Sequence, residues 1–276
     1  ALAPLDEGVP SPAAVSIDTK RKAVQHLTGG IVKQVLVKEG ALVKEGQPVI
    51  LLDGAVARAN YESVRQRYLG LRAAQGRLLA EQAGTGVIKL HPDLKEAASD
   101  PLIQTQVATQ QQLFQSRRAA LRAELEGMEE SIRGQQAMLL AYDGMLASRR
   151  SQLASLQDEL KHTRDLVAEG YAPRNRQLEL VRSVAVAQSG IADLVGNTTR
   201  AQRSVGELRQ RAIARQQEYR KEVERELTEV TREVQSDAEK FVAVQADLER
   251  TEIRSPASGQ VVGLAVQTVG GVVQPG

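Results

Sequence analysis

The chain has 276 residues with only 3% aromatics and no Trp, which is too few large rings for the packed core of an ordinary globular domain. Hydrophobic residues still reach 42%, and this mixture is typical of long helices packed through narrow seams. The net charge of +2 comes from interspersed charges that leave no basic patch for a nucleic acid, and the absence of Cys excludes disulfides and thiolate metal sites.

Proline positions predict where the two longest helices lie. Two long proline-free stretches are separated by Pro173 alone, and proline is disfavoured in helix interiors. We therefore expect helices over about 101–169 and 174–250. Gly170 can cap the first of these helices and Pro173 can open the second, so the pair forms a hairpin.

A third helix is predicted over about 54–83, ahead of the other two, because its apolar residues also recur at heptad spacing. At a rise of about 1.5 Å per residue the three helices measure roughly 45, 100 and 115 Å in chain order. The first two together outrun the third. The loop 84–100 is therefore expected to double back, which makes the base of the hairpin three helices thick.

Heptad repeats indicate that the hairpin is a coiled coil. Apolar residues recur every seven positions in both long helices, with Glu, Gln, Arg and Ser between them. The alternative of solvated helices in a globular bundle fits less well, because bundle helices are much shorter. The repeat in the first long helix consists of Leu125, Ile132, Leu139, Leu146, Leu153, Leu160 and Val167.

The segments that flank the helices resemble each other. Both are Val-rich and punctuated by Gly, which predicts short strands joined by tight turns. Either half alone has too few strands to be stable, so the two halves are expected to meet in space. One inserted residue near Val269 aligns Gly30, Val37, Gly40, Val43 and Gly46 with Gly259, Val266, Gly270, Val273 and Gly276.

The flanking sequences suggest a family. GIVKQVLVKEGALVKEGQPVILLD resembles one half of a biotinyl/lipoyl domain, and IRSPASGQVVGLAVQTVGGVVQPG resembles the other. A helical hairpin stands where carrier domains present a modified lysine, and no such lysine turn is visible. A split lipoyl domain with this insertion resembles the periplasmic adaptors, or membrane fusion proteins, of the HlyD family. The tip sequence LVAEGYAPRNRQLEL resembles the branch that serves type I secretion of metalloproteases and lipases.

The resemblance implies an α+β fold, with a long antiparallel coiled-coil hairpin, three helices thick at its base, inserted into a split lipoyl-like β-sandwich. The expected divisions are a lipoyl half over 26–53, the helical hairpin domain over 54–250 and a truncated second half over 251–276. Family members usually also carry an inner-membrane helix and a β-barrel domain. Residues 1–25 are therefore expected to be a strand or linker from a β-barrel that this chain lacks.

The resemblance also implies a function. The protein is expected in the periplasm, anchored in the inner membrane of a Gram-negative bacterium by a helix absent from this chain. It is expected to link an inner-membrane ABC transporter to a TolC-like outer-membrane channel, as a ring of six copies, for export of a protein such as an alkaline metalloprotease. The alternatives are an adaptor of a drug-efflux pump, a lipoyl-type carrier and a purely structural coiled coil.

Two surfaces are candidate sites for these partners. Superfamily adaptors often carry Arg, Leu and Ser/Thr at fixed spacing near the tip, and Leu166 fits the Leu position while His162 and Pro173 depart from the other two. The alternative to partner binding is a purely structural role, as a simple turn at the tip and as solvated polar turns at the lipoyl edge. The tip candidates are His162, Arg164, Leu166, Gly170, Tyr171, Pro173 and Arg174, and the candidate ring contacts at the lipoyl edge are Lys38, Glu39, Lys44 and Glu45.

Enzymatic readings find little support in the sequence. His26, His91 and His162 are scattered and lack the spacing of metal ligands. The pairs Gly29-Gly30 and Gly270-Gly271 lack the strand–loop–helix setting of a phosphate-binding loop. We therefore expect no enzymatic activity and no cofactor.

Overall fold

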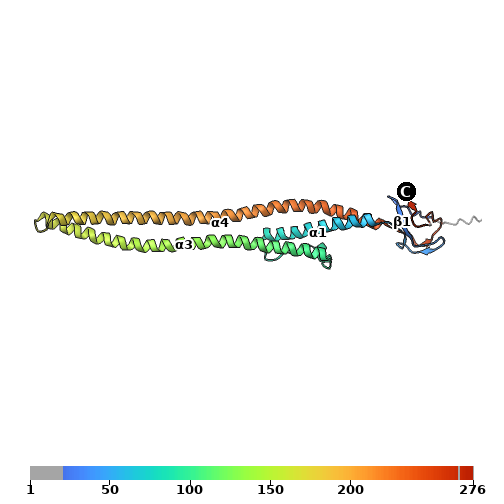
Figure 1. The fold of residues 1–276 in the computed structure, drawn as a ribbon, viewed down its shortest axis with the longest axis horizontal. Helices are drawn as coiled ribbons and strands as arrows, with labels where there is room; N and C mark the ends of the chain where they lie inside the picture. The colour runs from blue at the N-terminus through green and yellow to red at the C-terminus, as the bar shows by residue number, and fades with distance from the viewer. Residues whose placement is uncertain (1–20, 267, 276) are drawn as a thin grey trace, which may run out of the picture. The chain divides into compact units, whose positions relative to one another are not determined.

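The computed structural model describes residues 21–266 and 268–275, so most of the strand or linker expected over 1–25 lies outside the described residues. Four helices and six short strands make up the fold, and Figure 1 shows the long α3 and α4 running side by side with α1 beside them. The elements are β1 (Gly30–Val35), β2 (Leu42–Val43), β3 (Pro48–Leu52), α1 (Ala55–Ala83), α2 (Pro92–Glu96), α3 (Pro101–Ala168), α4 (Arg174–Arg250), β4 (Glu252–Arg254), β5 (Gly259–Gln260) and β6 (Val272–Val273).

The chain divides into two compact units, one formed by residues 1–67 with 236–276 and the other by 68–235. The first contains the strands. The second contains most of the long helices. The α+β fold class and the helical hairpin inserted between two β halves are confirmed.

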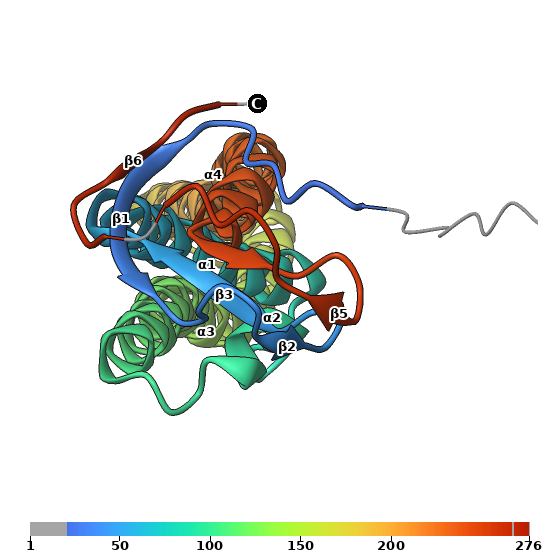
Figure 2. The same cartoon turned by 90° about the vertical axis from the view of Figure 1, so that its right-hand side faces the viewer.

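The strands form a four-stranded antiparallel sheet in the order β4-β3-β1-β6 and a separate pair, β2-β5. Figure 2 shows β6 running along β1, and β2 beside β5. Each of these two pairings joins a strand from one half to a strand from the other. In the β2–β5 pair, Leu42 lies opposite Gln260 and Val43 opposite Gly259. In the β1–β6 pair, Ile31 lies opposite Val272 and Gly30 opposite Val273.

The repeat in the sequence accounts for this register. Aligning the two halves as above converts the β2–β5 pairing into the β6–β1 pairing, residue for residue. The backbone hydrogen bond from Gly40 N to Val261 O, 2.8 Å, has its counterpart from Gly270 N to Val32 O, 2.9 Å. The two halves are therefore related by a local pseudo-two-fold axis, and each completes the sheet of the other.

The core of this unit is aliphatic, as expected for strands built from Val, Leu and Ile. Alternation along the strands turns these side chains to one face, where they exclude water together. Residues from both halves contribute. The buried members are Val32, Val37, Val43, Val49, Ile50, Leu52 and Ile253, with Val261, Val266 and Val273 packed against them.

The first helix of the hairpin, α3, begins where its sequence predicts. The Asp100 side chain accepts a hydrogen bond from Leu102 N, 3.0 Å, and Pro101 occupies the first helical position. Beyond the base the two long helices meet along heptad positions. On α3 these are the predicted ones, whereas on α4 the buried Leu180, Ala187, Leu194 and Ala201 form a heptad position that the sequence reasoning did not name. The buried residues nearest the tip are Leu146, Leu160 and Thr163 on α3 and Leu180, Ala187 and Leu194 on α4.

Three helices make up the base of the hairpin, as expected. The side chains of Leu78 on α1, Ile103 on α3 and Val223 on α4 are at most 1% exposed. The loop 84–100 doubles back, and it contains the short helix α2, which the sequence reasoning had treated as loop. The buried Leu94 and a 2.6 Å hydrogen bond from Tyr68 Oη to Asp93 hold α2 in place.

Charged side chains are also buried in this base. The guanidinium of Arg77 lies 2.8 Å from the Glu81 carboxylate, donates to Gln110 on α3 at 2.8 Å and lies 3.4 Å from Glu226 on α4. Arg117 on α3 donates to the same Glu226 at 3.0 Å. These contacts tie all three helices together near the end of α1.

Candidate functional site

The tip of the hairpin is a tight turn built on Gly170. The N–H of Gly170 donates to Val167 O at 3.1 Å, and the N–H of Tyr171 donates to Leu166 O at 2.9 Å. This pair of bonds is a Schellman motif, which satisfies carbonyl groups that the end of α3 leaves unpaired. Gly170 has φ of +82°, in the left-handed region that glycine adopts without strain, and Pro173 then stands directly before α4.

Two large side chains at this turn are exposed. Tyr171 is 80% exposed and Leu166 is 46% exposed, whereas the neighbouring Val167 is half-buried in the seam between the helices. Val167 therefore closes the coiled coil, and Leu166 faces solvent. Exposed Tyr and Leu side chains on a rigid turn are suited to contacting another protein.

Basic residues surround the turn. Arg164, Arg174 and His162 are all exposed, and His162 Nδ1 is bonded to the backbone carbonyl of Asp158 at 2.9 Å. Sequence reasoning missed Arg176, whose guanidinium lies 2.5 Å from Glu159 and closes the two helices just below the tip. The hydrogen bond to Glu159 raises the pKa of Arg176 above its usual range. The heptad register could have revealed this pair, because both residues flank the seam on the same side.

The lipoyl edge carries the second group of candidates. Lys38, Glu39, Lys44 and Glu45 lie on the two turns of the first half and are exposed. The Glu39 carboxylate accepts hydrogen bonds from the backbone N–H groups of Gly263, 2.6 Å, and Leu264, 2.8 Å. These bonds lower the pKa of Glu39. Glu39 thus holds the second half against the first, a role that the sequence did not indicate.

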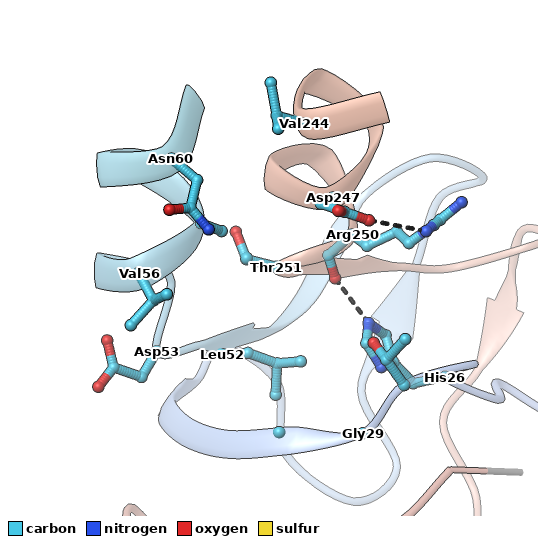
Figure 3. A pocket seen from close by; sticks show the side chains of 13 residues that line it. His26, Gly29, Leu52, Asp53, Val56, Asn60, Val244, Asp247, Arg250 and Thr251 are labelled. Atoms are coloured by element: carbon cyan, nitrogen blue, oxygen red, sulfur yellow. Dashed lines mark hydrogen bonds and ion pairs between the residues drawn. The ribbon is translucent and has the colours of Figure 1, made fainter. Parts of the chain in front are cut away.

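A cleft of about 350 Å³ lies between the sheet and the adjoining ends of α1 and α4 (Figure 3). Its polar side chains serve the local fold. His26 Nε2 donates to the Arg250 carbonyl at 2.8 Å, and Asp53 accepts from Ala55 N at 3.1 Å to cap α1. Arg250 in turn donates to Asp247 at 2.9 Å. The cleft presents no pairing of a nucleophile with a base among its described residues.

The described residues contain neither a metal-binding cluster nor a helix that could span a membrane. Over 21–266 and 268–275, no three His, Cys, Asp or Glu side chains gather closely enough to hold a metal ion. None of the helices in this part of the chain has the length and apolarity needed to cross a bilayer. The exposed features that remain are the tip and the lipoyl edge.

Comparison with known proteins identifies the hairpin. The family model of the AprE long alpha-helical hairpin matches residues 57–247. The chain belongs to this family. The match spans most of α1, the tip and nearly all of α4, so it covers the helices whose packing is described above.

Relatives of this AprE-type hairpin function in secretion. The alkaline protease secretion protein AprE of Pseudomonas aeruginosa is 38% identical over the whole chain, and the proteases secretion protein PrtE of Dickeya chrysanthemi is 35% identical. The chain spans 64% and 61% of the lengths of these two relatives. The names of both relatives refer to protease secretion.

A solved structure shares the fold. The soluble domain of LipC, a membrane fusion protein of a type I secretion system, superimposes with a TM-score of 0.83 at 35% identity. The match covers 92% of this chain and 96% of that one. The resemblance to the membrane fusion proteins of type I secretion, noted in the sequence, is thereby confirmed.

Proposed function

We propose that this chain is the periplasmic section of an adaptor that links an inner-membrane ABC transporter to a TolC-like outer-membrane channel. The cargo is an exported protein such as an alkaline metalloprotease. The observation that carries this proposal is the LipC-like fold over 92% of the chain, together with the relatives AprE and PrtE, whose names refer to protease secretion. A membrane anchor elsewhere in the full protein would hold it at the inner membrane.

The tip is proposed as the docking site for the channel. Tyr171 and Leu166 supply exposed apolar area on a turn that Gly170 and the Arg176–Glu159 ion pair hold in shape. Burying such side chains on binding costs little entropy when the turn is already ordered. Arg164 and Arg174 add positive charge that would steer an acidic partner to the tip.

The lipoyl edge is proposed as the contact between neighbouring copies in a ring, six in the proposed assembly. The free side chains of Lys38, Lys44 and Glu45 are available for such contacts, and both signs of charge are present. Glu39 is proposed to act indirectly, since its carboxylate is bonded within the same domain.

The proposal is tested by site-specific cross-linking in the full-length protein during secretion. Cys replaces Tyr171 at the tip or Leu140 on the flank of α3, which is 76% exposed and serves as a matched control. Both variants are scanned against Cys positions on the periplasmic end of the channel. We expect adducts from Tyr171→Cys only. Adducts from Leu140→Cys alone would move the docking site to the flank, and no adduct from either in a secreting strain would contradict the adaptor proposal.

A further inference from the structure

Glycines occur inside the long helices at positions where no packing contact within the described chain requires them. Each of the six glycines inside the helices α3 and α4 has open space around the position of an added Cβ. The two glycines inside α1 differ, because a Cβ on Gly70 would meet the Gln106 side chain at 2.8 Å and one on Gly76 would meet Ile88 and Lys89 at 3.2 Å. The six without such contacts are Gly127, Gly134 and Gly144 on α3 and Gly190, Gly196 and Gly206 on α4.

These six glycines lie in one section of the hairpin. Two ion pairs between α3 and α4 set the level of facing residues, namely Glu124 with Arg215 and Glu159 with Arg176, both at 2.5 Å. In an antiparallel pair the residues between these anchors face one another. Residues 127–144 of α3 and 190–206 of α4 therefore occupy the same level, and we name these two segments together the glycine belt.

The glycines do not share a face. Gly144 lies midway between the seam positions 142 and 146 of α3, and Gly196 lies midway between the seam positions 194 and 198 of α4. Each glycine is therefore on the face of its helix that points away from the other helix. Gly190 precedes the seam residue Ile191, whereas Gly206 follows the seam residue Val205, so these two lie on opposite flanks. A single partner surface does not reach all of them. What they have in common is their level along the hairpin.

Packing on the α3 side of the belt is also weak, whereas α4 buries Leu194, Ala201 and Val205 there. Between Phe114 and Leu146, α3 buries none of its side chains, and the polar Gln135 occupies a seam position. No ion pair joins α3 to α4 within the described residues of the belt. Figure 1 shows α3 bowed along this stretch.

Hydroxyl side chains that bond back to the preceding turn occur at several levels of α3 and α4, and the belt contains some of them. Ser131 Oγ donates to Gly127 O at 3.0 Å, and the hydroxyl of Thr198 donates to Leu194 O at 2.8 Å. Such bonds to the preceding turn compete with the helical ladder and often bend helices. Glycine at an exposed interior position further lowers helix stability, because it exposes the backbone and gains no side-chain packing.

We propose that the glycine belt is a compliant joint built into the hairpin. The helices open locally and bend there, so the tip half changes direction relative to the base half while the anchoring ion pairs on both sides stay formed. The inference needs no assumption about the partner at the tip. In an adaptor, such a joint would let the tip adjust its direction to its partner without unfolding.

Hydrogen–deuterium exchange of the purified chain tests the local opening. We expect amides of the belt to exchange faster than those of the flanking segments 110–121 and 152–160, at equal intrinsic rates. Replacing all six belt glycines by Ala should slow exchange in the belt, by about fourfold for amides in the turn around each site. The control variant replaces Ser116, Ser151 and Ser183 by Ala, which improves helix propensity outside the belt and should leave exchange in the belt unchanged.

Double electron–electron resonance, which measures the distribution of distances between two spin labels, tests the bending. Spin labels at Arg182→Cys and Arg209→Cys, both exposed, span the belt on α4 at about 40 Å. The chain with its glycines should give a broader distance distribution than the six-alanine variant, and the serine control should match the unmodified chain. Equal widths in all three, or exchange in the belt no faster than in its flanks, would overturn the proposal.

Discussion

Replacing Glu81 by Leu should destabilise the three-helix base more than any change at the surface of the hairpin. The Glu81 side chain is 1% exposed and its carboxylate lies 2.8 Å from Arg77, which is itself buried. Removing one partner of a buried pair costs about 3–5 kcal/mol, because the other charge is left without compensation. Arg77 keeps its contacts with Gln110 and Glu226, so we expect the lower end, about 3 kcal/mol.

Thermal unfolding followed by circular dichroism at 222 nm measures this loss, and the melting temperature should fall by roughly 6–12 °C. The matched control is Glu130→Leu, which breaks an ion pair with Arg133 whose side chains are 62% and 75% exposed, and it should cost less than about 1 kcal/mol. Adding Arg77→Met to Glu81→Leu should recover most of the lost stability. A loss from Glu81→Leu no larger than the control, or a double variant less stable than the single one, would refute the argument.

Three further outcomes are expected. Burial opposes ionisation of Glu226, but hydrogen bonds from Arg117 and Arg77 lower its pKa below 4.5 overall. The stability that Glu226 contributes is therefore present above about pH 4.5 and lost as the pH falls through the lowered pKa, which urea titrations at pH 3 to 7 would detect. Gly170→Ala should cost about 1 kcal/mol, because φ is +82° there, and a melting temperature unchanged from the parent would argue against the turn geometry. Val167→Ala should lower the free energy of unfolding, while Leu166→Ala should leave it within about 0.5 kcal/mol of the parent, and equal losses would contradict their different exposure.

The sequence alone was enough to predict the elements whose signals repeat. Proline-free stretches and heptads located α3 and α4 because a long coiled coil requires the same apolar position in every heptad. The aligned glycines and valines of the two flanks predicted that the halves meet, and in the observed register Val43 and Val273 occupy equivalent places in two of the strand pairs that join the halves. Elements whose residue pattern repeats along the chain can therefore be predicted without knowledge of tertiary contacts.

Individual side-chain contacts between elements could not be predicted from the sequence. Arg77 and Glu81 look like ordinary solvated helix charges until α1 packs against α3 and α4. Glu39 was considered as a surface charge for contacts between copies, whereas its carboxylate binds two backbone N–H groups 224 and 225 residues away. At the tip, exposure separates Leu166 from Val167, and only the register of the seam decides which of these neighbours points outward.

The cross-half strand pairs have a consequence for how the protein folds. Joining segments more than 200 residues apart across a flexible chain would cost about 5 kcal/mol in loop-closure entropy. A preformed hairpin removes most of that cost, because it returns the chain to its starting point before any strand pairs. We therefore expect the helices to form first and the sheet last, after β5 and β6 have left the ribosome. Until then the first half has only its own β1–β3 pair, and the strand edges that β4, β5 and β6 later cover are the part of the nascent chain most exposed to aggregation.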